Sequence, residues 1–393
     1  MPARIIFTEE FCQPENLYPF SLTRQIQDIR VGILTIREKW ETVLGIPSFD
    51  KWEDDYKDHE RSIRIDKHIG DDVFFMIHGN ILPSPKLVKN IQRLQNGEFI
   101  SVNGNAGIIF RFTKKEINEP HKIKVSKALT IRSEPKTIVF PWDIFYLNDY
   151  ALRQDYKLLT RKRKSQTISK TNRITGKSNI FLEKGAVVEN CCINATAGPV
   201  YIGKGAHIMD GSLICGPVSI GDGAVLKMGT KIYGATTIGP GCTVGGEIKN
   251  SVFFGYSNKA HDGYIGDSVI GEWCNLGAGT TNSNMKNNAS PVRVWTSKGE
   301  QEAGQKCGMF MGDYSRTSIN TSINTGTVIG VCCNVFGNGL TPKYVPSFSW
   351  GYDGVQRYDI EKAIADINNW KKLKNKSITK NEKKILKHIF ENF

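Results

Sequence analysis

Residues 200–244 read VYIGKGAHIMDGSLICGPVSIGDGAVLKMGTKIYGATTIGPGCTV, a stretch with an unbroken six-residue period. The residues at this spacing are the branched aliphatics Ile202, Ile208, Ile214, Ile220, Leu226, Ile232, Ile238 and Val244. Small residues such as Ala206, Ser212 and Thr230 follow four places later. A hexapeptide repeat of this kind is typical of a parallel β-helix, whose triangular coils stack and complete each other's hydrogen bonds. We expect the aliphatic residue to point inward and the small residue to stand near a corner.

The same frame continues on both sides of this stretch. Its members are Leu182 and Val188 before it, and Ile270, Leu276, Met311, Thr317, Ile323, Ile329 and Val335 after it. Cys192, Cys242, Cys274 and Cys333 fall four places after a repeat start, so they are interpreted as small corner residues, not metal ligands. Residues 245–264 and 282–308 interrupt the frame and are expected to be loops, where binding chemistry concentrates. The frame predicts a β-helix over residues 180–345.

The remaining parts of the 393-residue chain show other patterns. Residues 1–152 are expected to form an α/β domain, with strands over 4–8, 73–78 and 107–112 and a helix over 143–159. A basic linker over 153–179 would follow. A helical tail is expected over 346–393. It would contain an amphipathic helix over 359–374 and a last helix to about residue 390, opened by a capping box of Thr379 and Glu382.

Composition excludes several classes of protein. Apolar residues make up 39% of the chain, too many for wholesale disorder. No apolar run reaches about 18 residues, so no membrane span is expected, and no secretory signal is recognised, which favours the cytoplasm. The net charge of +13 is concentrated in residues 153–177 and 361–393. Such segments are more often solvated than bound to nucleic acid, and no nucleic-acid partner is predicted.

Residues 245–284, GGEIKNSVFFGYSNKAHDGYIGDSVIGEWCNLGAGTTNSN, are more specific than the repeat alone. They resemble the bifunctional N-acetylglucosamine-1-phosphate uridyltransferase/glucosamine-1-phosphate acetyltransferase family, above all its shortened sugar nucleotidyltransferase relatives. The resemblance covers about residues 180–340. It implies a left-handed parallel β-helix, a homotrimer, and sites for the co-substrate acetyl-CoA between subunits.

The resemblance also implies the site residues. The catalytic histidine falls on His261. The implied substrate-binding residues are Glu247, Lys249, Tyr264, Asn275 and Asn284. An amino sugar is mostly protonated near neutral pH and must lose a proton before it attacks a thioester. Histidine, with an ordinary pKa of about 6.5, suits that task. A turn residue without a catalytic role is the alternative for His261.

Three positions depart from the family's pattern. Tyr233 stands where the family has an arginine that binds the sugar phosphate. Ser290 stands near the place of a later lysine, although Arg293 is close in sequence. The segment from Phe310 to Asp313 stands where the family has a serine that contacts acetyl-CoA. Because anions are bound best by arginine or lysine, a different or unphosphorylated sugar remains an alternative substrate.

The N-terminal part resembles sugar nucleotidyltransferases more distantly, through residues 17–24 (LYPFSLTR) and 74–80 (FFMIHGN). The resemblance implies a reduced Rossmann-like domain. No glycine-rich loop precedes Leu17, and Asn80 stands in place of the aspartate that would bind Mg²⁺. Mg²⁺ is therefore expected only if this domain is active, and no other metal site is predicted. Arg24 and Arg30 are candidates for binding a nucleotide or phosphate; structural pairing with acidic residues is the alternative.

These observations predict an acetyl-CoA-dependent acetyltransferase that acts on an amino sugar, carried as a sugar phosphate or a nucleotide sugar, with His261 as general base. One alternative is a sugar-1-phosphate nucleotidyltransferase that uses the N-terminal domain. Another is a non-catalytic protein that binds sugar nucleotides.

Overall fold

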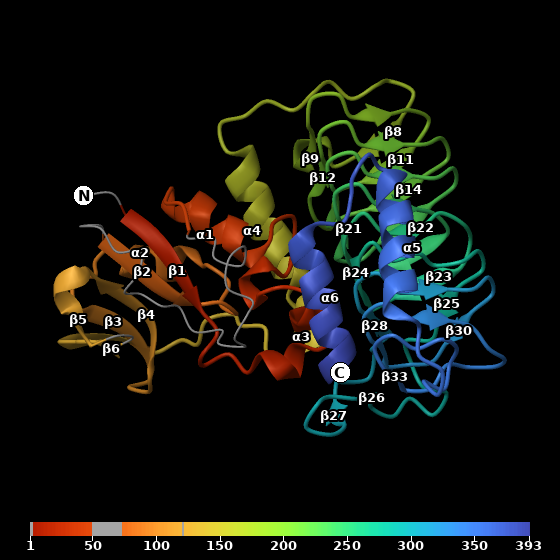
Figure 1. Ribbon diagram of the computed structural model, residues 1–393. Helices are drawn as coiled ribbons and strands as arrows, with labels where there is room; N and C mark the ends of the chain where they lie inside the picture. The colour runs from red at the N-terminus through yellow and green to blue at the C-terminus, as the bar shows by residue number, and fades with distance from the viewer. Residues whose placement is uncertain (1–2, 49–72, 120–121) are drawn as a thin grey trace. The chain divides into compact units, whose positions relative to one another are not determined.

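The structure is a computed structural model that describes residues 3–48, 73–119 and 122–393 (Figure 1). Its contacts divide the chain into two compact units. The first unit contains the residues up to Pro14 together with Gln25–Ile29 and Leu34–Val139. The second contains Glu15–Arg24, Arg30–Ile33 and Phe140–Phe393. This division lies at residue 139 instead of the expected 152, and it assigns two short N-terminal segments to the second unit.

The first unit is an α/β domain around one mixed sheet with the strand order β1-β2-β4-β3-β7. Its strands are β1 (Ala3–Thr8), β2 (Val73–His78), β3 (Glu98–Val102), β4 (Gly107–Phe112) and β7 (Lys127–Ile131). The β1–β2 and β3–β7 pairs are parallel, whereas β4 is antiparallel to both of its neighbours. The unit also contains α1 (Ile36–Leu44), α2 (Pro85–Ile91) and the short hairpin of β5 (Ile117–Glu119) and β6 (Lys122–Ile123). The three strands expected here are confirmed.

The second unit is a parallel β-helix whose coils have three faces, each named here by its longest sheet. The nine-strand face contains β9 (Ile180–Leu182), β12 (Val200–Ile202), β15 (Val218–Ile220), β18 (Thr236–Ile238), β21 (Val252–Gly255), β24 (Val269–Glu272), β28 (Met309–Met311), β31 (Thr327–Ile329) and β33 (Tyr344–Val345). The six-strand face contains β8 (Arg173–Thr175), β11 (Cys192–Asn194), β14 (Leu213–Cys215), β17 (Lys231–Tyr233), β20 (Glu247–Lys249) and β23 (Tyr264–Gly266). The five-strand face contains β10 (Val187–Val188), β13 (His207–Ile208), β16 (Val225–Leu226), β19 (Thr243–Val244) and β22 (Asn258–Lys259).

Pairing continues beyond these three sheets. Bridges through Asn275 extend the five-strand face to the parallel pair β29 (Arg316–Thr317) and β32 (Asn334–Val335). A further parallel pair joins β25 (Thr281–Asn282) to β30 (Ser322–Ile323). The expected β-helix is therefore present, and it runs from β8 to β33. The expected linker over 153–179 is shorter than predicted, because α4 ends at Thr160 and β8 already pairs with β11.

The interior of the coils matches the six-residue frame. All eight aliphatic residues between Ile202 and Val244 are buried, as are the corner residues Cys242, Cys274 and Cys333. The interpretation of Cys192 was wrong: it is exposed on the six-strand face, and Cys191 is buried in its place. The frame shortens by one residue here, because Ile193 points inward instead of residue 194.

Only one of the two interruptions leaves the coil. Residues 245–264 were expected to be a loop, but they form β20, β21, β22 and the start of β23, in register with the coils on either side. Residues 283–308 do project from the β-helix and contain the antiparallel hairpin β26 (Arg293–Val294) and β27 (Gln301–Glu302). The ring of Trp295 in this excursion stacks on Tyr344, with 3.8 Å between centroids.

Helices cover parts of the β-helix. The single helix expected over 143–159 is two helices, α3 (Pro141–Tyr146) and α4 (Asn148–Thr160), which contact β24 and β18 of the nine-strand face. The tail forms α5 (Ile360–Lys372) and α6 (Lys380–Asn392), and the capping box of Thr379 and Glu382 is confirmed. Figure 1 shows α5 alongside the coils, where Trp370 lies over the guanidinium of Arg316. In the described ranges, no helix is long and apolar enough to cross a membrane.

Candidate functional site

Strands β20 and β23 bring three candidate residues onto the six-strand face. Glu247 lies directly opposite Tyr264, one coil further along, and Lys249 lies at the other end of β20. Ile248 and Ile265 between them are fully buried. Because neighbouring side chains in a strand point to opposite sides, Glu247, Lys249 and Tyr264 point outward.

Tyr233, on the adjoining strand β17, holds the carboxylate of this group. Its hydroxyl donates a hydrogen bond of 2.6 Å to Oε1 of Glu247. The ammonium of Lys249 lies 5.9 Å from the centre of the Tyr233 ring. The hydrogen bond to Glu247 is the main reason why the pKa of Tyr233 is raised to about 12. The phenol therefore stays protonated near neutral pH and fixes Glu247.

Asn284 and Asp267 complete the cluster around Tyr264. The Asn284 amide donates to the Tyr264 hydroxyl at 3.1 Å and also to the carboxylate of Asp267. The Asn250 amide donates to the other oxygen of Asp267 at 2.6 Å. Burial, and then the charge of Asp267, raise the pKa of Tyr264 to about 12. Both Tyr264 and its amide partner are thus held in one orientation.

Asp267 was missed by the sequence analysis. It is buried and has a φ of 48°, in the left-handed region that aspartate tolerates better than most residues. Its place directly after Gly266, at a coil corner, is a signal that could have identified it as a turn residue. The sequence could not show that its carboxylate turns toward Asn250 and Asn284.

His261 lies in the turn between β22 and β23, where the five-strand and six-strand faces meet. Its side chain is exposed and makes no hydrogen bond within the described part of the chain. The neighbouring coils hold this turn tightly. A Cβ on Gly245 would lie 2.4 Å from the carbonyl oxygen of Ala260, and one on Gly263 would lie 2.1 Å from that of Thr280. The exposed imidazole of His261 is therefore carried by a turn whose backbone is closely packed.

Asn275 is not brought together with the other candidates. It lies on the five-strand face, bridged to Asn258 on one side and to Arg316 on the other. Its Oδ1 accepts a hydrogen bond of 2.7 Å from the Asn258 amide. Within one chain, Asn275 and Tyr264 are therefore on different faces of the β-helix.

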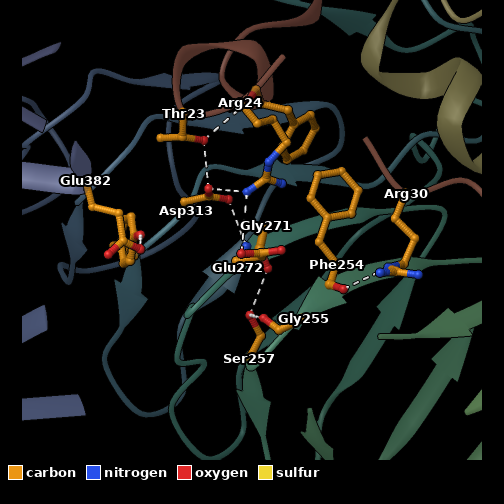
Figure 2. A network of polar contacts seen from close by, with 12 residues as sticks. Thr23, Arg24, Arg30, Phe254, Gly255, Ser257, Gly271, Glu272, Asp313 and Glu382 are labelled. Atoms are coloured by element: carbon orange, nitrogen blue, oxygen red, sulfur yellow. Dashed lines mark hydrogen bonds and ion pairs between the residues drawn. The ribbon is translucent and has the colours of Figure 1, made fainter. Parts of the chain in front are cut away.

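Arg24 and Arg30 attach the short N-terminal segments to the β-helix (Figure 2). Arg24 forms an ion pair with Asp313, and its guanidinium lies 4.8 Å from the centre of the Phe254 ring. Arg30 donates through Nε to the carbonyl oxygen of Phe254 at 3.1 Å. The acidic partner of Arg24 agrees with the structural alternative, whereas Arg30 donates to backbone carbonyl oxygens. A role of either arginine in phosphate binding stays a prediction.

The same network occupies Asp313, the last residue of the segment where the resemblance places a serine that contacts acetyl-CoA. Its Oδ1 accepts from the backbone nitrogen of Glu272 and its Oδ2 accepts from the Thr23 hydroxyl, at 2.8 and 2.7 Å. Figure 2 shows this carboxylate enclosed between the Arg24 segment and the strand of Glu272. Asp313 is therefore a packing residue here.

The residues near Asn80 do not fit a magnesium ion. The Asn80 amide donates to the carbonyl oxygen of Ile138 at 3.1 Å, and its oxygen accepts from the Cys12 thiol at 3.4 Å. Nowhere in the described ranges do three or more His, Cys, Asp or Glu side chains form a group that could hold a metal. Since Mg²⁺ prefers carboxylate oxygens and water, we derive no step through this ion.

The fold and the face cluster together define a hexapeptide-repeat β-helix joined to an α/β unit. In comparisons with known proteins, residues 5–164 match the family model described as sugar nucleotidyl transferase. The chain is 31% identical over 106 residues to the bifunctional protein GlmU of Methanocaldococcus jannaschii, covering 27% of this chain and 26% of that protein. It is 36% identical over 91 residues to the bifunctional sugar-1-phosphate nucleotidylyltransferase/acetyltransferase of Sulfurisphaera tokodaii, covering 23% of each.

The expected resemblance to these bifunctional transferases is confirmed, and the chain spans about a quarter of the length of the curated relatives it matches. Among solved structures, an Arabidopsis UDP-N-acetylglucosamine acyltransferase aligns with 57% of this chain and 90% of its own. The identity is 14% and the TM-score is 0.22.

Proposed function

We propose that the protein transfers an acetyl group from acetyl-CoA to the amino group of an amino sugar, carried as a sugar phosphate or a nucleotide sugar. The observation that carries this proposal is the exposed His261 on its tightly packed turn, three residues before Tyr264 and beside the cluster on the six-strand face. The Sulfurisphaera tokodaii relative, which is named as a nucleotidylyltransferase and acetyltransferase, supports it.

In this proposal His261 acts as general base. It accepts the proton that the amine nitrogen loses as the nitrogen attacks the thioester carbonyl carbon. A carbon–nitrogen bond forms, the carbon–sulfur bond breaks, and the histidine returns the proton to the departing sulfur. An imidazole suits both transfers because its neutral form accepts the proton and its protonated form donates it to the sulfur.

The cluster supplies groups that can hold the acceptor. Lys249 offers a cation for a phosphate, and Glu247 offers a carboxylate for the ammonium form of the sugar. The protonated Tyr264 offers a hydroxyl in a fixed orientation. Tyr233 stands in place of an arginine, and its hydroxyl is hydrogen-bonded to Glu247. Lys249 is therefore the cation that this cluster offers to a phosphate. The acceptors to be assayed accordingly include unphosphorylated amino sugars.

A homotrimer is part of the proposal. Asn275 and Tyr264 lie on different faces of one chain, so a site that uses both is completed by a second copy. We place the reaction in the cytoplasm, because all nine cysteines are unpaired and such thiols stay reduced there.

The test measures thiol release from acetyl-CoA with a panel of amino sugars, amino-sugar phosphates and amino nucleotide sugars. The His261→Ala variant should lower kcat by about 10²–10⁴-fold, the usual contribution of one general base. His207→Ala, which removes an exposed histidine from the five-strand face, is the matched control and should keep full activity. Wild-type turnover by His261→Ala on an established acceptor would refute the role of this base.

Nucleotidyl transfer by the N-terminal part is the second candidate, because residues 5–164 match the sugar nucleotidyl transferase model. The missing glycine-rich loop and the engaged Asn80 side chain argue against it. We expect no pyrophosphate release from nucleoside triphosphates, hexose 1-phosphates and Mg²⁺. Turnover in that assay would show that other residues replace the loop, whereas inactivity in both assays would leave a non-catalytic binding protein.

A further inference from the structure

Lys259 occupies a position that the repeat reserves for aliphatic residues. The parallel pairing of β16, β19 and β22 places it in one inward row with Leu226 and Val244. Its exposed fraction is 0%, the same as that of these two neighbours. A lysine is almost never fully buried without a specific partner, so its contacts are informative.

The ammonium of Lys259 bonds to the backbone of the turn that carries His261. It donates to the carbonyl oxygen of His261 and, at 2.8 Å, to that of Asp262. The Asp262 carbonyl also accepts from the backbone nitrogen of Gly279 in the next coil, at 3.0 Å. Within the described part of the chain, Lys259 is the group that donates a hydrogen bond to the His261 carbonyl oxygen. One buried cation thus ties two successive peptide groups to the interior.

Burying a charged ammonium costs free energy. Burial lowers the pKa of Lys259 to about 8, and the negative charge of Asp262 opposes that shift only in part. An uncharged side chain of similar length would fill the same row without desolvating a cation. Local rules broken at a cost in stability are characteristic of functional sites. The burial cost therefore points to a role in function.

We propose that Lys259 is a positioning residue for acetyl transfer, whose ammonium fixes the peptide groups of His261 and Asp262 and so sets the direction of the imidazole. This inference rests on the proposed function of His261. It goes further by assigning a task to a side chain that does not reach the surface and therefore does not touch the substrate.

The decisive variant is Lys259→Met, which keeps the length of the side chain and removes its charge and its donors. Displacing a reacting group by about 1 Å costs on the order of 10²-fold in rate, so kcat should fall by about 10- to 100-fold. KM for the acceptor should change by less than about threefold, because the residues that bind it are untouched. Leu226→Met places the same side chain in the same row, two coils away, and should leave kcat unchanged.

A double-mutant cycle separates positioning from a general structural effect. If Lys259 acts through His261, adding Lys259→Met to His261→Ala should cause no further loss of kcat. Thermal unfolding of Lys259→Met should occur at the same or a higher temperature than that of the wild type. Additive losses, unchanged kcat in the single variant, or a lowered unfolding temperature would each overturn the proposal.

Two further measurements do not depend on catalysis. Hydrogen exchange at the amides of residues 260–263 should be faster in Lys259→Met than in the wild type and unchanged in Leu226→Met. Between about pH 8 and 10.5 the unfolded lysine binds more protons than the folded one, so the wild-type free energy of unfolding should gain a contribution that rises with pH. Lys259→Met should lack that contribution.

These measurements also distinguish the failure of the two proposals. If no acceptor supports thiol release by the wild type, the proposed function fails, and exchange in the turn still tests the contact. If His261→Ala is impaired while Lys259→Met has normal kcat and normal exchange, only the positioning role fails.

Discussion

The ion pair of Arg24 and Asp313 shows how much one charged side chain can hold in place. The side chains are 10% and 3% exposed, and they join a segment near the N-terminus to the late coils of the β-helix. Removing one partner of a buried ion pair strongly destabilises the fold, because the other charge stays buried without compensation. This ion pair therefore contributes to the attachment of residues 15–24, together with the Thr23 hydrogen bond and the stacking of Arg24 on Phe254.

Replacing Arg24 by Met should lower the free energy of unfolding of the second unit by about 3–5 kcal/mol, because it leaves the Asp313 carboxylate buried and uncompensated. Urea denaturation of the full chain measures this change. The control is Lys387→Met, which breaks an exposed pair with Glu361 and should leave the denaturation midpoint nearly unchanged. Equal, small effects of both variants would show that water reaches Asp313.

At the residue scale, the sequence predicted the composition of the candidate site better than its geometry. The resemblance identified Glu247, Lys249 and Tyr264, which do lie together on the six-strand face, and Asn284, whose amide donates to the Tyr264 hydroxyl from the excursion that follows β25. It also grouped Asn275 with them, although Asn275 lies on another face. Only the pairing of coils determines which face a residue joins, and that pairing depends on corner lengths that vary from coil to coil.

At the scale of the strand, the direction in which a side chain points decides its contribution to stability. Leu213 and Ile214 are neighbours on β14 and have nearly the same volume. Ile214 is 2% exposed and lies in the aliphatic interior, whereas Leu213 is 47% exposed on the six-strand face. Substitutions of Leu213 and Ile214 can therefore be compared directly.

We expect Ile214→Ala to destabilise the β-helix by about 2–5 kcal/mol, through lost burial and the cavity that remains. Leu213→Ala should change stability by less than about 1 kcal/mol in the separated chain, since its side chain is already half in water. Chemical denaturation at a low protein concentration compares the two. Similar losses in both variants would mean that Leu213 is also covered.

The elements were predictable where one periodic signal dominated, as in the coils, in β1, β2 and β4, and in α6 with its capping box. The division at Leu147 between α3 and α4 was not visible, because both halves continue a helical pattern. Residues 245–264 were misread as a loop because the coil corners shorten there, which shifts the six-residue frame without ending the β-helix. A fixed six-residue period fails where a coil has fewer residues at its turns and its strands still pair in register with the neighbouring coils.

For the whole molecule, light scattering at micromolar concentration should give about three times the mass of the 44.0 kDa chain. The reason is the separation of Tyr264 and Asn275 onto different faces, which leaves a site that uses both incomplete in one copy. A mass equal to that of a single chain, together with full acetyltransferase activity, would contradict this expectation. In that case Asn275 would have no part in the site.

The exposed Cys192 gives the β-helix a natural attachment point for a probe. Burial raises the pKa of Cys12, Cys242 and Cys333 to about 12, so these thiols form little of the reactive thiolate at neutral pH. Cys192 is exposed on β11, and the half-buried Cys215 lies on the adjoining strand β14, opposite Asn194. After Cys215→Ser, a maleimide fluorophore attached to Cys192 would report from the six-strand face of the native β-helix. Energy transfer between labelled copies would then follow their association in real time.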